Sequence, residues 1–159
     1  MAVDYDKFDK AVNAKELKAQ MDSAPKFDNK PVEEGIYIVK LKSMEIKETK
    51  DHKKLMLSVS MQIVKNCNDS KDEVKRYVFW NRVICGNEYK ENWNDGIAIA
   101  GVITWINELG YEPIEFTSYK QLAEDVLEIY QSAADEIEIK IDYDPDAFNP
   151  IEILEVIDA

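Results

Sequence analysis

Alternation of apolar and polar residues predicts several β-strands in this chain. The clearest case is residues 54–64, where five apolar positions alternate with a more polar set made of Lys54, Met56, Ser58, Ser60 and Gln62. A period of two places the two sets on opposite faces of a strand. We therefore expect the apolar set, Leu55, Leu57, Val59, Met61 and Ile63, to face a core, and the other set to face solvent or a ligand.

Four further segments read as strands. Residues 136–143 alternate in the same way, and residues 36–48, 74–84 and 151–157 are rich in β-branched and aromatic side chains. The polar runs 49–53 and 144–146 predict turns between neighbouring strands.

Three segments have helical patterns. Residues 4–22 carry apolar side chains at spacings of three to four, and residues 23–34, with Pro25 and Pro31, predict a linker or turn. Residues 97–109 are apolar nearly all round and predict a buried helix. Ser118 and Gln121 have the spacing of a capping box that starts another helix, which we expect to run to about residue 131.

The order of these elements predicts the fold class. After the linker come three strands, two helices and two strands, which is the element order of a five-stranded Greek-key barrel, the OB-fold. We therefore expect a mainly β (α+β) chain with a helical insertion. The expected domains are an N-terminal helix and linker over residues 1–30, and an OB-fold-like barrel over residues 31–159.

The strand at 74–84 contains the only two arginines of the chain. Alternation places Arg76, Val78, Trp80 and Arg82 on one face, and Tyr77, Phe79, Asn81 and Val83 on the other. A face with an aromatic ring between two guanidinium groups suits single-stranded nucleic acid, because bases stack on the ring and phosphates pair with the arginines. The alternative is a core strand with solvated arginines at its rims. If Trp80 is core, Tyr77 and Phe79 become the stacking residues.

Charge is distributed unevenly along the chain. The net charge is −12, but residues 1–90 carry 18 basic and 15 acidic side chains, whereas residues 91–159 carry 2 and 17. The field over a surface follows local charge, so a basic groove on this acidic chain can still bind phosphate, with strong salt dependence.

Further basic and aromatic residues extend the expected nucleic-acid site. Lysines at the turn between the first two strands, with His52, continue the basic track, and two aromatic residues after the third strand supply further stacking surfaces. Besides Arg76, Trp80 and Arg82, the site residues that we expect are Lys40, Lys42, Lys50, His52, Lys53, Lys54, Lys75, Tyr89 and Trp93.

Four stretches of the sequence resemble a known family. They are residues 31–37 (PVEEGIY), residues 47–57 with Lys47–Lys50 and Lys54–Leu57, residues 78–81 (VFWN), and residues 144–151 (DPDAFNPI). Together they make the chain similar to the OB-fold single-stranded-DNA-binding proteins encoded by bacteriophages. The resemblance implies a replication or recombination accessory of the bacterial host cytoplasm that coats single-stranded DNA. It also implies replication or recombination proteins and further copies of the chain as partners. The segment 153–159 departs from the acidic tail that many of these proteins carry, so we do not expect recruitment through a tail.

Motifs for catalysis are not found in the sequence. It contains no P-loop, no G-x-G-x-x-G, no H-E-x-x-H and no G-x-S-x-G, and His52 is the single histidine. We therefore expect no enzyme activity, no cofactor and no metal, and we interpret Asp142, Asp144 and Asp146 as an acidic turn. The charged N-terminus and the absence of a long apolar run predict a cytoplasmic protein without a membrane segment. A different function stays open, in which the acidic half mimics DNA and inhibits a nucleic-acid enzyme.

Overall fold

The computed structural model describes residues 5–11, 13–23, 31–68 and 71–159. The chain divides into two compact units, Met1–Pro31 and Val32–Ala159. The first unit contains α1 (Tyr5–Ala11) and α2 (Ala14–Ser23), where one continuous helix was expected. Val12 of the expected apolar stripe and most of the expected linker, residues 24–30, lie outside the described residues.

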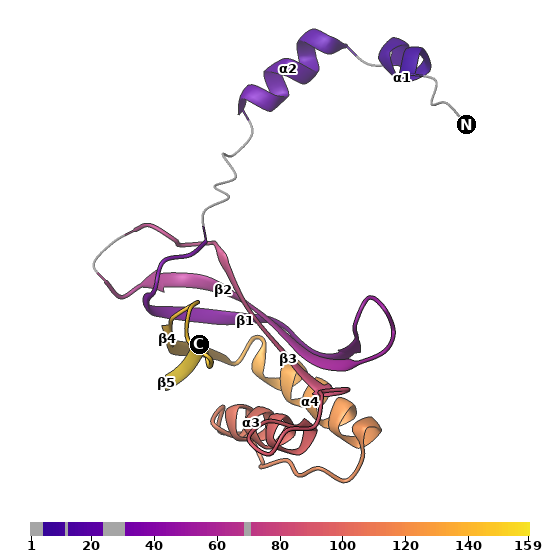
Figure 1. Cartoon of the computed structure of the whole chain (residues 1–159). Coiled ribbons are helices and arrows are strands. Elements are labelled where there is room, and N and C mark those ends of the chain that lie inside the picture. The colour runs from indigo at the N-terminus through magenta and orange to yellow at the C-terminus, as the bar shows by residue number, and fades with distance from the viewer. Residues whose placement is uncertain (1–4, 12, 24–30, 69–70) are drawn as a thin grey trace. The chain divides into compact units, whose positions relative to one another are not determined.

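The second unit is built on one five-stranded sheet. Its strands are β1 (Gly35–Glu48), β2 (Leu55–Asn66), β3 (Tyr77–Cys85), β4 (Ile137–Tyr143) and β5 (Ile151–Asp158). They are hydrogen-bonded in the order β3-β2-β1-β4-β5, and every neighbouring pair is antiparallel. The sheet curls into a half-barrel (Figure 1). The expected fold class, a mainly β OB-like barrel with a helical insertion, is confirmed.

Irregularities in strand pairing help the long strands to bend. The β1–β2 register shifts between Ile38 and Val39 and again between Leu41 and Ser43. An extra residue in one strand kinks it and increases the local twist. Two such shifts within one strand pair therefore favour the curl that gives the sheet an inner and an outer face.

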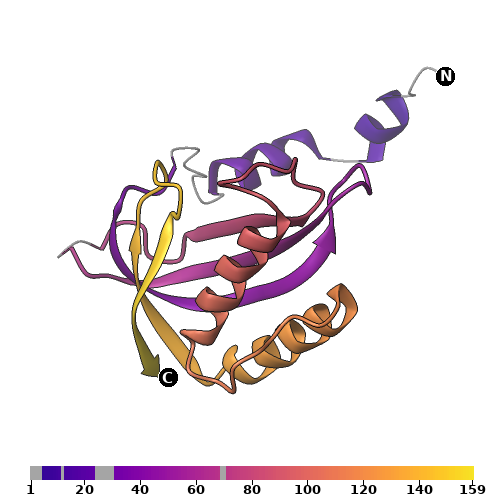
Figure 2. The same cartoon turned by 60° about the horizontal axis from the view of Figure 1, so that its bottom comes forward.

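Two helices cover the inner face of the sheet. The helices α3 (Asp95–Asn107) and α4 (Tyr119–Ala133) lie on the same side of the sheet (Figures 1 and 2). The Asn94 side chain caps α3, and the expected capping box of Ser118 and Gln121 is present at α4. Their buried side chains, such as Val102, Ile106, Leu122 and Val126, join the core formed by the inner faces of β1, β2 and β4.

The structure decides which face of β3 points outward. Trp80 is only 6% exposed, and its ring packs against Trp105 of α3 with a centroid separation of 5.0 Å. Tyr77 and Phe79 are 44% and 60% exposed. The expectation that Trp80 faces outward to stack a base is therefore wrong, because Trp80 faces the sheet's inner, helix-covered side. The alternative strand phase, with Tyr77 and Phe79 outward, is the one observed.

We predict that Trp80→Ala lowers the free energy of unfolding by about 3–5 kcal/mol, the usual cost of removing a buried tryptophan. Tyr77→Ala, three residues earlier on the opposite face, should cost less than about 1 kcal/mol. Urea denaturation of the two variants measures both values. Equal losses would contradict the assignment of the two faces.

Candidate nucleic-acid interface

The outward positions of β1, β2 and β3 form one continuous surface, which we call the outer face. Strand register places Tyr77, Phe79, Asn81 and Val83 of β3 opposite Gln62, Ser60, Ser58 and Met56 of β2, respectively. These pair in turn with Lys40, Ser43, Glu45 and Lys47 of β1. All twelve side chains are exposed or half-buried, and Glu45 is the single acidic residue among them. The outer face is thus open to solvent and slightly basic within a strongly acidic protein.

Two aromatic rings form a platform on the outer face. Tyr77 and Phe79 are two residues apart on β3, so both rings stand on the same side of the strand. Their centroids lie 6.3 Å apart, and the planes are only 18° from parallel. The platform therefore consists of two exposed, nearly parallel rings, and exposed aromatic rings are surfaces on which the bases of a single strand stack.

Small hydroxyl side chains lie beside the platform. Ser60 is the cross-strand partner of Phe79, and Ser43 is the partner of Ser60 on β1. The two hydroxyl oxygens are 2.6 Å apart and hydrogen-bonded to each other. These short side chains keep the surface low next to the aromatic rings, which leaves room for a bound chain.

The turn between β1 and β2 supplies cations at one end of the outer face. Lys50, His52, Lys53 and Lys54 are all exposed there. The Nδ1 atom of His52 lies 2.7 Å from Glu48, so a neighbouring carboxylate already partners this residue. A Cβ atom built on Gly86 would lie 2.7 Å from Cγ of Lys54, which places the turn next to the end of β3.

Of the remaining predicted lysines, Lys40 and Lys75 lie at the other end of the outer face, and Lys42 lies near the middle of β1. Lys40 is opposite Gln62, and its Nζ atom is 3.8 Å from the exposed carboxylate of Asp135. Gln62 donates a hydrogen bond to the carbonyl of Lys75, whose side chain is exposed. Lys42 is exposed on β1, and its carbonyl accepts a hydrogen bond from Tyr130 of α4. Cations therefore flank the platform at both ends.

The surroundings of Arg76 differ from those expected of a residue that binds phosphate. Its Nη1 atom donates to both carboxylate oxygens of Glu73, at 3.0 and 2.8 Å. The Glu73 side chain is only 14% exposed, so this ion pair is well shielded from water. The contact stabilises the loop before β3, and the positive charge of Arg76 is largely compensated within the protein.

Arg82 is the centre of an aromatic cluster that joins β3 to the loop between β4 and β5. Its guanidinium carbon lies 4.6 Å from the ring centroid of Phe148, 5.2 Å from that of Trp93 and 5.7 Å from that of Trp80. Its Nη2 atom donates to the carbonyl of Phe148 at 3.1 Å and to Oδ1 of Asn149 at 3.2 Å. Burial lowers the pKa of the Arg82 guanidinium below its ordinary value. We call this group the Arg82 clasp.

The two predicted aromatic residues after β3 differ in role. Trp93 is half-buried, packs edge-on against Phe148 at 5.0 Å and donates its indole N–H to Asn87. It belongs to the Arg82 clasp and offers little free ring surface. Tyr89 is 82% exposed and stands outside the clasp.

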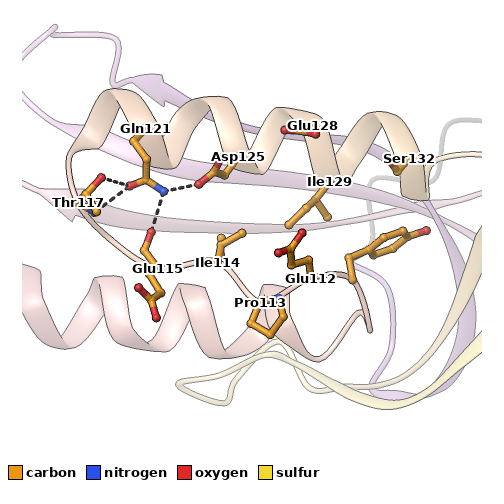
Figure 3. A pocket seen from close by; sticks show the side chains of 11 residues that line it. Glu112, Pro113, Ile114, Glu115, Thr117, Gln121, Asp125, Glu128, Ile129 and Ser132 are labelled. Atoms are coloured by element: carbon orange, nitrogen blue, oxygen red, sulfur yellow. Dashed lines mark hydrogen bonds between the residues drawn. The ribbon is translucent and has the colours of Figure 1, made fainter.

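The acidic half of the chain forms a separate pocket of about 490 Å³ between α4 and the segment that precedes it (Figure 3). Glu112, Glu115, Asp125 and Glu128 are among its lining residues. Gln121 crosses one end of the pocket, where it hydrogen-bonds to the carbonyl of Glu115 and to the carboxylate of Asp125. This surface repels nucleic acid.

Comparison with known proteins gives no relative: no family model, no curated protein and no solved structure matches the chain. Among the described residues there is no cluster of three or more His, Cys, Asp or Glu side chains that could hold a metal ion. The described helices also include none with the length and apolar content needed to cross a membrane.

We predict that Arg82→Met lowers the free energy of unfolding by about 1–3 kcal/mol, since it removes two hydrogen bonds and the cation–π contacts of the clasp. Arg82→Lys should lose part of the same stability, because a lysine cannot reproduce the planar stacked group. Urea denaturation measures the effect. A variant with wild-type stability and strongly reduced oligonucleotide affinity would instead support the phosphate contact expected from the sequence.

Proposed function

We propose that the protein binds single-stranded DNA on the outer face, without strong sequence preference and without catalysis. The observation that carries the proposal is the exposed, nearly parallel pair of rings of Tyr77 and Phe79 on an open antiparallel sheet. Base–aromatic stacking is tolerant of sequence because every base has a π-face. A duplex offers no unstacked bases, so single strands should bind better.

The distribution of charge supports the same surface. Lys40 and Lys75 lie at one end of the platform, and Lys47, Lys53 and Lys54 lie at the other. Residues 91–159, which include α3, α4, β4 and β5, carry 17 acidic and only 2 basic side chains. Repulsion from that side and attraction along β1–β3 would direct a polyanion to the outer face.

A shallow cleft continues the outer face beyond Phe79. Phe79, Asn81 and Val83 of β3 line one side of it, and Phe148 and Pro150 of the β4–β5 loop line the other. The lining residues include no carboxylate. Phe148 is largely exposed, so its ring provides a further apolar surface along the path of a bound strand.

We expect Tyr77→Ala and Phe79→Ala each to weaken binding of a labelled oligo-dT by about 5- to 150-fold, because stacking of one base is worth about 1–3 kcal/mol. Fluorescence anisotropy at low salt measures the affinities, and a thermal melt should show that both variants remain folded.

Phe116→Ala is the matched control for the platform variants. Phe116 is 40% exposed, similar to Tyr77, but it lies in the segment before α4. The Phe116→Ala variant should leave the affinity for oligo-dT unchanged. Equal losses in Phe79→Ala and Phe116→Ala, or equal affinity for single strands and duplex, would rule out the platform as the binding site.

Salt dependence tests the basic turn. Each phosphate contact contributes about −0.7 to the log–log slope of affinity against salt on single strands. Replacing both Lys53 and Lys54 by Gln should therefore make the slope shallower by about 1.4. Lys120→Gln, on the exposed surface of α4, changes charge away from the outer face and should leave the slope as it is. An unchanged slope in the double variant would place the phosphates elsewhere.

The resemblance to bacteriophage single-stranded-DNA-binding proteins supports a biological role in replication or recombination within a bacterial cytoplasm. The acidic pocket of Figure 3 favours a second candidate function, in which the carboxylates of α4 and its preceding segment act as surrogate phosphates toward a nucleic-acid enzyme. A DNA mimic does not bind DNA. The oligonucleotide titration described above therefore separates the two functions.

A further inference from the structure

A second groove of about 530 Å³ lies on the other side of the Arg82 clasp. The α3 helix forms one wall between Ile97 and Glu108, which corresponds to about three helical turns or roughly 16 Å. The segment Phe148–Glu152 contributes to the opposite side, and the buried side chains of Trp80, Val102 and Trp105 lie beneath the groove. The groove is thus long enough for a short peptide segment.

The charge of the groove is opposite to that of the outer face. Arg82 is its only basic lining residue, and the contacts of the clasp already engage the guanidinium group. Glu108 and Glu152 line the groove, and Glu152 is shared with a neighbouring pocket that contains Glu34, Asp142 and Asp144. An apolar groove that continues into carboxylates repels a nucleic-acid strand and attracts a cationic ligand with apolar side chains.

Two features make the groove accessible to a ligand. A Cβ atom added to Gly101 of α3 meets nothing within 4 Å, so the groove is open above the middle of the helix. Ile97 and Phe148, which are 39% and 68% exposed, supply accessible apolar surface to the groove.

We propose that this groove binds a lysine- or arginine-flanked apolar segment of a partner protein. The apolar side chains of the segment pack over Gly101 and against Ile97 and Phe148, and its cations face Glu108 and Glu152. An amphipathic helix laid into a hydrophobic groove is a common mode of peptide recognition. The inference is independent of DNA binding, since the groove contains neither Tyr77 nor Phe79.

The three tryptophans of the chain provide a built-in signal for the experiment. Trp80, Trp93 and Trp105 all line the groove, and the chain has no other tryptophan. The probes are synthetic amphipathic peptides about three helical turns long, with leucine and phenylalanine anchors, lysines elsewhere and no tryptophan. Matched peptides replace the lysines by glutamate or the anchors by serine. Titration of the full chain, followed by tryptophan emission, gives the affinities.

Gly101→Leu is the decisive variant, because it fills the groove without changing charge and replaces glycine by a better helix former. The Gly101→Leu substitution should lower the affinity for the lysine peptide by about tenfold or more. Ala100→Leu adds the same side chain one position earlier on the exposed surface of α3, outside the groove, and should bind the peptide like the wild type. Both variants should bind oligo-dT normally in the anisotropy assay.

The opposite results overturn the inference. If Gly101→Leu and the wild type bind the lysine peptide equally well, the peptide does not occupy the groove, and its binding reflects only general attraction to an acidic protein. Equal binding of the glutamate peptide, or no saturable binding by any peptide of the series at millimolar concentration, would exclude a cationic apolar ligand. Loss of oligo-dT binding in Gly101→Leu would assign the groove to the nucleic-acid site. Loss of oligo-dT binding in Phe79→Ala alone would concern the outer face and would not affect the inference about the groove.

Discussion

The Arg82 clasp is the contact on which the shape of the second unit depends. In the sheet order, β3 and β5 are the two end strands, so backbone hydrogen bonds do not pair them within the half-barrel. Arg82 connects β3 to the β4–β5 loop through Phe148 and Asn149, and the indole of Trp105 on α3 donates to the carbonyl of Ile151 at the start of β5. Side chains therefore connect the two ends that a continuous barrel ladder would otherwise join. The outer face, the cleft beyond Phe79 and the groove along α3 all take their positions from this closure.

The chain separates two kinds of surface by strand phase and by sequence region. On β3, alternate residues either enter the core or form the aromatic platform, so a shift of one position would exchange the two sets. The β1–β2 hairpin, residues 35–66, carries 7 basic and 3 acidic side chains, whereas residues 91–159 carry 2 and 17. A net charge of −12 is compatible with a slightly basic face because the two regions differ strongly in local charge, and the field over a surface follows local charge.

The sequence predicts the fold better than the site, and β2 and β3 show why. On β2 the inward phase is uniformly apolar and the outward phase is mostly polar, so alternation alone assigns both faces correctly. On β3 both phases contain aromatic and branched residues, and the two arginines accompany the inward one. An arginine can pack its stem and its planar group against aromatic rings while retaining its charge, so its presence does not show which face is solvated. The clasp was not predictable either, because Arg82 and Phe148 are far apart in sequence and meet only through the β4–β5 loop.

The edge position of β5 has a consequence for how copies of the chain behave toward one another. An exposed edge strand presents unpaired backbone groups and can add a strand from a second molecule. On β5 the side chains of Glu152, Glu155 and Asp158 are exposed along this edge, which makes the approach of two β5 strands electrostatically unfavourable. The carboxylates of β5 thus act as a guard against sheet extension between copies of the chain.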